Sequence, residues 1–280
     1  DSQAALLWTL NNVTRNPLVV FCDTGWEHPL TYKHVEETTK ALGLELSTLR
    51  SKKYTDMVDL ATRKKRWPSV RARFCTEELK TKPMIDFILD VVQDHCVVVQ
   101  GIRAAESPNR AKMQAQCTYF KYYFEPYGYD KHGKPKYHTY RKKDIIAYCK
   151  KYAADVLRPV FDKSGQWVID YIIESGQQPN PMYRMGYKRG GCYPCVQCSH
   201  KDILNISQQD PEHLEYIADL EKKINATFFG PNKIPAKAYK GDFPVMKDIV
   251  HYVRWQNATG SLFDDDNTAT SCMSFYGLCE

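Results

Sequence analysis

The sequence predicts an α/β protein with a doubly wound, mostly parallel, Rossmann-like sheet, followed by a helical, cysteine-bearing C-terminal part. Short apolar runs typical of buried strands alternate with longer segments in which apolar residues recur at helical spacing. Several of these runs end in glycine or in polar residues, as strands do where they lead into loops. Alternation of strands and helices is the pattern of a parallel sheet covered on both faces.

The expected elements follow one another along the first hundred residues. In chain order they are a helix over 1–11, a strand over 17–22, a helix over 31–42, a strand over 44–49, a helix over 77–92 and a strand over 95–100. Ligands bind at the carboxyl ends of the strands in such sheets. The loops that follow residues 22 and 100 are therefore the expected binding loops.

A segment rich in Tyr, Lys, Gly and Pro interrupts this pattern at about 119–141, and it predicts a β-hairpin insertion. Basic residues that alternate with aromatic ones suit phosphate pairing and base stacking, but tyrosine-rich hairpins also simply pack on their host domain. Both interpretations stay open. We expect a nucleotide-binding domain over residues 1–160, which includes this insertion, and a helical region with a cysteine cluster over 161–280.

The helical region carries one clear start signal. Asp210 is a good N-cap residue, and Pro211 suits the first helical position that follows it. Further helices are expected over 142–152, before this region, and over 167–175 within it.

The composition is that of an ordinary globular protein, with 43% hydrophobic and 26% charged residues among 280. Ten cysteines without a signal-peptide pattern fit a reducing compartment, and we expect a cytoplasmic protein. No apolar run approaches the ~20 residues of a membrane helix. The net charge is +6, with positive residues clustered at 63–66 and 141–143. Such runs are either solvated helix faces or contacts for an anionic partner.

Three cysteines within seven residues, Cys192, Cys195 and Cys198, are the strongest chemical signal. They lie on a turn shaped by glycine and proline, so their sulfur atoms can point at one centre, as zinc and iron–sulfur clusters require. The alternative is a set of small buried thiols or a redox pair.

Two loops and one helix start carry residue types that suit phosphate binding. Residues 23–25, Asp-Thr-Gly, follow a buried strand and offer one carboxylate and backbone groups. In the loop from Gly101 to Arg110, glycine lets the backbone approach a ligand, while Arg103 and Arg110 can bind phosphate oxygens in a bidentate manner. The alternative for these arginines is a pair of surface side chains.

Cys75 lies at a helix start, where the helix dipole favours a thiolate. Lys80 follows about one turn later and can add a phosphate contact.

Together these segments resemble the phosphoadenosine phosphosulfate reductase group of the PP-loop ATP pyrophosphatases, whose fold is adenine nucleotide alpha-hydrolase-like. The matching segments, in the family's order, are Asp23-Thr24-Gly25; Cys75 with Lys80 and Pro83; Gly101, Arg103, Ser107 and Arg110; and Asn180-Pro181-Met182-Tyr183 through Gly186-Tyr187 to Cys192 and Cys195. The resemblance spans most of the chain and implies that the first and third of these segments bind a nucleotide.

The family's phosphate loop, Ser-Gly-Gly-x-Asp-Ser, follows its first strand. Here the chain opens at Asp1 and Ser2, which resemble the last two residues of that loop. The resemblance implies that both contact the phosphates, with Ser2 at the amide-rich start of a helix. We expect the glycines of the loop to lie upstream of Asp1; the alternative is that the protein has lost this loop.

The resemblance also implies the ligands of a cluster. In the cluster-bearing reductases a Cys-Cys pair precedes the Lys-x-x-Pro element, and a Cys-x-x-Cys motif follows later. The residues that match three of the four positions are Cys75, Cys192 and Cys195. Phe74 occupies the fourth position, for which Cys198 is the nearest substitute and Cys272 or Cys279 are contenders. We expect a [4Fe-4S] cluster, with zinc as the alternative.

The leading functional hypothesis is an ATP-using sulfurtransferase similar to the DNA phosphorothioation enzymes among the PP-loop relatives. Such an enzyme adenylates a nucleic-acid oxygen, releases pyrophosphate and lets sulfur replace that oxygen. Lys80, Arg103 and Arg110 would neutralise phosphate charge, with Mg²⁺ bridging the phosphates and Asp23 close by. DNA is the expected partner, and a cysteine desulfurase is the expected sulfur donor.

Two alternatives remain. One is a sulfonucleotide reductase that releases sulfite, with Cys279 or Cys272 attacking sulfur and thioredoxin reducing the product. The family keeps its redox cysteine in a Glu-Cys-Gly-x-His type motif, whereas residues 277–280 read Gly-Leu-Cys-Glu. The other is a non-catalytic nucleic-acid-binding module.

Overall fold

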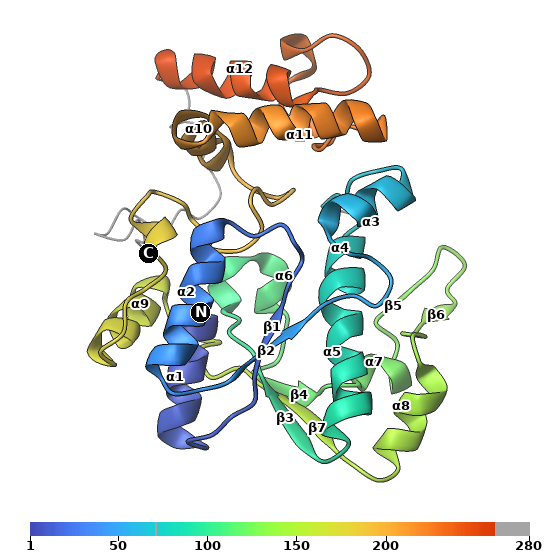
Figure 1. Cartoon of the computed structure of the whole chain (residues 1–280). Coiled ribbons are helices and arrows are strands. Elements are labelled where there is room, and N and C mark those ends of the chain that lie inside the picture. The colour runs from blue at the N-terminus through green and yellow to red at the C-terminus, as the bar shows by residue number, and fades with distance from the viewer. Residues whose placement is uncertain (71, 261–280) are drawn as a thin grey trace. The chain divides into compact units, whose positions relative to one another are not determined.

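The computed structural model describes residues 1–70 and 72–260 (Figure 1). It confirms the mixed α/β class and the helical C-terminal part. Contacts divide the chain into two compact units. Among the described residues, unit 1 comprises Asp1–Val19 and Met84–Pro179, and unit 2 comprises Val20–Pro83 and residues 180–260. This contact-based division differs from the predicted boundary at residue 160, because each unit draws on two separate segments of the chain.

Unit 1 is built on a three-stranded sheet in the order β3-β7-β4. Its strands are β3 (Cys96–Val99), β4 (Gln116–Thr118) and β7 (Ala154–Leu157). β3 and β7 are parallel, with Cys96 opposite Ala154, whereas β4 runs antiparallel to β7. The parallel pair confirms a strand within the predicted range 95–100, but this strand is not buried as expected, since its residues are half-buried and Val97 is 58% exposed. The segment between β3 and β7 supplies the long crossover that parallel strands require.

Unit 1 also contains several helices. They are α1 (Ser2–Asn12), α5 (Lys82–Phe87), which is followed by a π-helical turn (Ile88–Val92), α6 (Pro108–Ala111), α7 (Lys121–Phe124), α8 (Lys142–Cys149) and α9 (Gly165–Glu174). α1 contacts both α9 and β3. Ile88, Phe120 and Ile145 are fully buried in the core beside the sheet. Burial of these apolar side chains is the main force that holds the unit together.

A hairpin lies at the predicted insertion, with β5 (Gly128–Tyr129) antiparallel to β6 (Pro135–Lys136). Its turn is closed by Asp130, whose carboxylate accepts from the amides of His132 at 2.8 Å and Lys134 at 2.9 Å. Gly133 has a φ of +77° at this turn, a conformation that favours glycine.

The basic run at 141–143 is partly neutralised within unit 1. Arg141 donates from Nη1 to Asp86 and from Nη2 to Asp90, each at 2.8 Å, and from Nε to Asp144 at 2.8 Å. Arg141 therefore ties α8 to the helix that precedes β3. The first residue of this basic run therefore has a structural role, which neither interpretation of the run had included.

Unit 2 combines a two-stranded sheet, β1 (Val19–Cys22) with β2 (Leu46–Leu49), and a larger set of helices. The helices are α2 (Pro29–Ala41), α3 (Met57–Lys64), α4 (Phe74–Thr76) with a π-helical turn (Glu77–Thr81), α10 (His200–Gln209), α11 (Pro211–Ile224) and α12 (Met246–Ala258). The last three pack on one another (Figure 1). α11 begins where the sequence predicts, and the Asp210 carboxylate accepts from the His213 amide at 3.3 Å.

The core of unit 2 is rich in aromatic rings. Trp26, Trp67 and Phe228 are at most 5% exposed, and their ring centroids lie between 4.8 and 6.1 Å apart. Ile217 and Ile249 are fully buried in the same core, on α11 and α12. The loop after β1 is thereby anchored on the C-terminal helices. Within the described ranges, no helix is long and apolar enough to cross a bilayer.

Candidate functional site

The start of α1 rests on the loop that follows β3. A Cβ atom at Gly101 would lie 2.3 Å from the Ser2 amide nitrogen and 2.5 Å from the Asp1 carbonyl carbon, so a side chain does not fit there. The Asp1 carboxylate accepts from Arg103 Nε at 2.8 Å. The structure thus brings together Asp1, Ser2, Gly101 and Arg103 at the amino end of an eleven-residue helix.

Arg103 and Arg110 both lie close enough to the start of α1 to act on Asp1 electrostatically. Arg103 lies over the beginning of α9, where a Cβ at Gly165 would be 3.5 Å from its guanidinium nitrogens. Arg110 pairs with Glu106, and the same carboxylate accepts from the Arg103 amide at 3.3 Å. The Asp1 backbone nitrogen is buried, and the charges of Arg103 and Arg110 act on it. Both guanidinium groups therefore raise the electrostatic potential at the start of α1.

Ser107 has a local role in this loop. It is the N-cap of α6, and its hydroxyl accepts from the Arg110 amide at 3.3 Å. This bond fixes the turn from which the Arg110 side chain projects.

The close approach at Gly101 gives a direct prediction. Gly101→Ala should destabilise the protein by about 1–3 kcal/mol, because the new methyl group would overlap backbone atoms of Asp1 and Ser2. Backbone atoms, unlike a flexible side chain, cannot relieve such an overlap by changing rotamer. Urea unfolding followed by circular dichroism measures this change. Gly128→Ala is the matched control, since a Cβ there meets nothing within 4 Å and should leave the midpoint nearly unchanged. Equal midpoints for the two variants would contradict the close approach.

In unit 2, Asp23 is the buried acid that follows β1. Its Oδ1 accepts from the Gly25 amide and from the Tyr32 hydroxyl, each at 2.8 Å, and its Oδ2 accepts from Arg50 Nε at 2.9 Å. Burial alone would raise the pKa of Asp23, but these hydrogen bonds and the Arg50 charge outweigh burial and lower it. Asp23 is therefore an ionised residue that shapes the loop.

Glu27 is the centre of a second buried network. Its carboxylate accepts from the Thr24 hydroxyl at 2.8 Å, from the Trp26 amide at 3.3 Å and from the Tyr32 hydroxyl at 3.1 Å. Lys80 Nζ lies 3.6 Å from Glu27 Oε1. The predicted residues Thr24 and Lys80 thus both contact Glu27, an acid that the sequence motifs did not indicate.

The cysteines of unit 2 lie beside this network. Glu27 and Cys192 form an isolated antiparallel bridge. Burial raises the pKa of the Cys192 thiol to about 11; Lys80 opposes this shift, while Glu27, Cys195 and Cys75 add to it. Three of the predicted ligands, Cys75, Cys192 and Cys195, are therefore close enough to act on one another electrostatically.

Cys198 is the most deeply buried of these thiols. Burial raises its pKa to about 12, and the nearby Cys195 adds to this shift. Cys272 and Cys279 lie outside the described residues. Thiolates at this spacing suit a soft metal centre, but among the residues that the structure describes, no three His, Cys, Asp or Glu side chains are arranged to hold a metal ion.

Three residues contribute to these networks without a motif signal: Glu27, Tyr32 and Arg50. Tyr32 donates to both Asp23 and Glu27, and Arg50 comes from the loop after β2. The one sequence signal that could have found Arg50 is its position directly after the second strand. Residues that follow neighbouring parallel strands meet at the same edge of a sheet, so Arg50 is expected near Asp23.

Comparison with known proteins places this geometry in a family. The model of the phosphoadenosine phosphosulfate reductase domain matches residues 1–198, and the chain belongs to this family. It therefore falls within the PP-loop ATP pyrophosphatase superfamily.

Sequence relatives occur in a phage and in an archaeon. An uncharacterized 37.8 kDa protein of Escherichia phage 186 is 29% identical over 242 residues, which cover 80% of this chain and 64% of that protein. Two uncharacterized proteins of Methanocaldococcus jannaschii are 28% and 23% identical and are covered over 37% and 46% of their lengths. The chain thus spans less than two thirds of each of these relatives.

Among solved structures, the phosphoadenylyl-sulfate reductase of Candida auris, determined as a phosphate complex, is similar at a TM-score of 0.41 and 15% identity. The match covers 68% of this chain and 75% of that one.

Proposed function

We propose that the chain is an ATP pyrophosphatase-type sulfurtransferase that modifies a nucleic acid, with the DNA backbone as its target. A phosphate oxygen of the strand attacks the α-phosphorus of ATP, and pyrophosphate leaves. A sulfur nucleophile from a cysteine desulfurase persulfide then displaces AMP, and a thiol reductant supplies the two electrons that free this sulfur. The observation that carries the proposal is the meeting of Asp1, Ser2, Gly101, Arg103 and Arg110 at the start of α1.

The start of α1 offers what a triphosphate needs. The first amides of an α-helix have no acceptor within the helix, and the helix dipole places partial positive charge there. Two guanidinium groups add charge and bidentate donors. In the structure these arginines pair with Asp1 and Glu106, which hold the side chains in position; Mg²⁺ bound with ATP would take part of the phosphate charge.

The insertion supports a polymeric partner over a small sulfonucleotide. Tyr123 is buried, whereas Tyr122, Tyr127 and Tyr129 are 45%, 52% and 65% exposed. Lysines at 131, 134 and 136 are exposed on the same hairpin. Exposed aromatic faces beside cations bind single strands by stacking and phosphate pairing.

A thiolate-bound cluster is part of the proposal. Cys75, Cys192 and Cys195 would supply three ligands, and Cys198, Cys272 or Cys279 the fourth; [4Fe-4S] is proposed, with zinc as the alternative. Such a group would give the site a structural or redox-active centre. Iron and sulfide analysis of anaerobically purified protein tests it, and Cys75→Ser should remove the bound iron.

Metal uptake by the cluster-free chain should strengthen as pH rises from 6 to 8. Cys192, with a pKa of about 11, is protonated throughout this range, so a metal must displace its proton, and apparent affinity rises by up to about tenfold per pH unit for each proton displaced. Titration with Cd²⁺, followed by its thiolate absorption band, measures the slope. Cys192→Ser should reduce the slope by one proton, whereas Cys117→Ser, in unit 1, should not. A slope of zero would contradict thiol ligation.

The decisive experiment compares two reactions. Anaerobically purified protein is incubated with ATP and, separately, with a sulfonucleotide, and pyrophosphate and sulfite are both assayed. We expect pyrophosphate from ATP and its stimulation by DNA. Sulfite from the sulfonucleotide without ATP turnover would overturn the proposal in favour of the reductase, which the family name makes the second candidate. If neither pyrophosphate nor sulfite is formed, the result would favour a non-catalytic binding module.

A further inference from the structure

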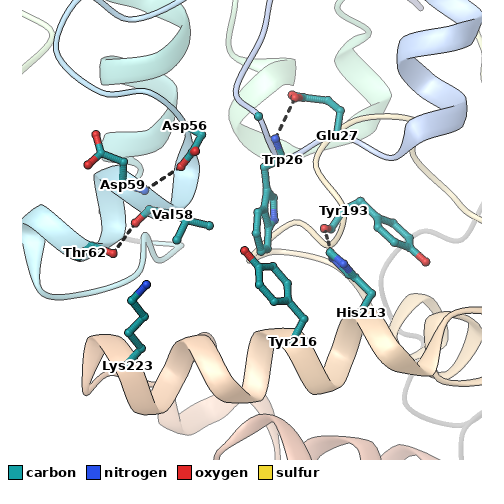
Figure 2. Close-up of a pocket in the computed structure, with 11 residues that line it drawn as sticks. Trp26, Glu27, Asp56, Val58, Asp59, Thr62, Tyr193, His213, Tyr216 and Lys223 are labelled. Atoms are coloured by element: carbon teal, nitrogen blue, oxygen red, sulfur yellow. Dashed lines mark hydrogen bonds between the residues drawn. The ribbon is translucent and has the colours of Figure 1, made fainter.

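Unit 2 contains a pocket of about 480 Å³ that the proposed reaction does not use. Figure 2 shows that it is formed by the loop after β1, the start of α3 and one face of α11. Of the predicted nucleotide-binding residues, Gly25 is the one that lines it. Its volume is in the range of sites that hold small organic ligands.

One wall of the pocket is aromatic. The Trp26 ring is 5% exposed, and its Nε1 donates to the Pro194 carbonyl at 3.0 Å. The His213 and Tyr216 ring centroids lie 5.6 and 6.5 Å from that of Trp26. His213 is itself held by a hydrogen bond of 2.8 Å to the Tyr193 carbonyl. This wall is therefore fixed before any ligand arrives.

Tyr216 differs from the other rings because it is 48% exposed. It projects from α11 toward the Trp26 ring, as Figure 2 shows. A half-exposed ring at the edge of a rigid aromatic wall offers a face on which a second flat ring can stack.

The opposite wall is polar. Asp56 is the N-cap of α3, with Oδ1 accepting from the Asp59 amide at 2.8 Å, and the Asp59 carboxylate accepts from Arg63 at 2.8 Å. Thr62 lies one turn along α3, and Lys223 reaches the pocket from α11. The pocket thus combines acceptor oxygens with one ammonium group.

We propose that this pocket binds an amino-bearing nucleobase, cytosine or adenine, of a single-stranded nucleic acid. The base stacks on Tyr216, its exocyclic amino group donates to Asp56, and the phosphate of the same nucleotide meets Lys223. This proposal rests on the nucleic-acid substrate proposed above and adds how a base of that substrate is held.

The combination of groups selects this ligand class. A carboxylate accepts from the amino group of cytosine and rejects the carbonyl that thymine presents at the same position. Stacking of a base on an aromatic side chain contributes about 1–3 kcal/mol. A basic peptide would find the two acids attractive, but Lys223 would repel its charges. A nucleotide uses the stacking face of Tyr216, the Asp56 carboxylate and the Lys223 ammonium group together.

The test measures the binding of fluorescein-labelled 12-mers of oligo-dC, oligo-dA and oligo-dT to the full chain by fluorescence anisotropy. Oligo-dC and oligo-dA should bind more tightly than oligo-dT. Tyr216→Ala should weaken all three by about 5- to 150-fold, the range that loss of one stacked base gives. Asp56→Asn should abolish the base preference, because an amide both donates and accepts; asparagine also caps a helix as aspartate does, so α3 is kept.

Two further variants serve as controls. Trp255→Ala removes a ring that is 53% exposed on α12, outside the pocket, and should change nothing. Tyr129→Ala, on the hairpin, should weaken binding without altering base preference. Pyrophosphate release from ATP is assayed for every variant, so that failure of the proposed ATP reaction can be told apart from failure of base binding in the pocket.

Several outcomes would overturn the pocket proposal. If Tyr216→Ala and Asp56→Asn bind the three strands as the unaltered chain does, the pocket holds no base, even where ATP turnover stands. If ATP displaces the strand and Tyr216→Ala raises the KM for ATP, the pocket belongs to the adenine of ATP. If no strand binds but an oligo-lysine peptide does, the acidic wall serves a protein partner.

Discussion

Arg103→Lys should lower the rate of pyrophosphate release from ATP by about 100-fold or more, the loss that removal of one preorganised donor typically causes. Arg103 is held by Asp1 at 2.8 Å and by contact with the first residue of α9, so its planar fork is already oriented. Lysine keeps the charge but loses the bidentate geometry and that orientation. Steady-state assays of pyrophosphate release over a range of ATP concentrations measure the effect on kcat and KM.

The matched control is Arg15→Lys, which alters an exposed arginine after α1 and should leave the rate unchanged. Thermal unfolding of both variants separates a catalytic effect from loss of structure. An Arg103→Lys enzyme that is folded and as fast as the unaltered chain would show that this guanidinium does not meet the phosphates.

The fold class was predictable because it depends on local patterns. The apolar run at 96–99 forms β3, and the one that ends at Cys22 forms β1. Both are short, apolar and followed by residues that stop a strand, so periodicity and turn residues suffice. The division into units was not predictable in this way, since it depends on which distant segments make contact.

The close backbone approach in the loop after β3 was predictable for a similar reason. Gly101 and Arg103 follow a strand directly, and a glycine at such a place indicates close backbone approach. What it approaches, the start of α1, is 99 positions earlier in the chain, from Gly101 to Ser2. Only the family resemblance linked these two segments before the structure was known.

The buried networks of unit 2 could not be predicted from spacing. Glu27 touches Lys80, which is far away in sequence and lies in a π-helical turn, and its backbone pairs with Cys192. No local pattern encodes such contacts. The tyrosines of the insertion show the same limit: Tyr122 and Tyr123 are neighbours in sequence, yet one is 45% exposed and the other is 5% exposed.

The second large effect is expected at Glu27. Glu27→Ala should lower the free energy of unfolding by at least ~2 kcal/mol, because the buried donors of Thr24 and Trp26 lose their acceptor and each such loss costs about 1–3 kcal/mol, whereas the Tyr32 hydroxyl keeps Asp23 as an acceptor. Glu27→Gln keeps one acceptor oxygen and should be affected less. Urea unfolding at pH 7 measures both variants. Glu37→Ala is the control, since its ion pair with Lys33 is on the surface and should contribute less than ~1 kcal/mol.

A second readout connects Glu27 to chemistry. Its negative charge raises the pKa of the Cys192 thiol, and its removal should lower that pKa while Lys80 continues to favour the thiolate. The thiolate is the reactive form, so Cys192 should be alkylated by iodoacetamide faster at pH 8 in Glu27→Gln than in the unaltered chain. Faster alkylation at Cys192, with unchanged alkylation at Cys117 in unit 1, would show that Glu27 restrains the reactivity of this thiol. Equal rates at Cys192 would show that the carboxylate serves the loop alone.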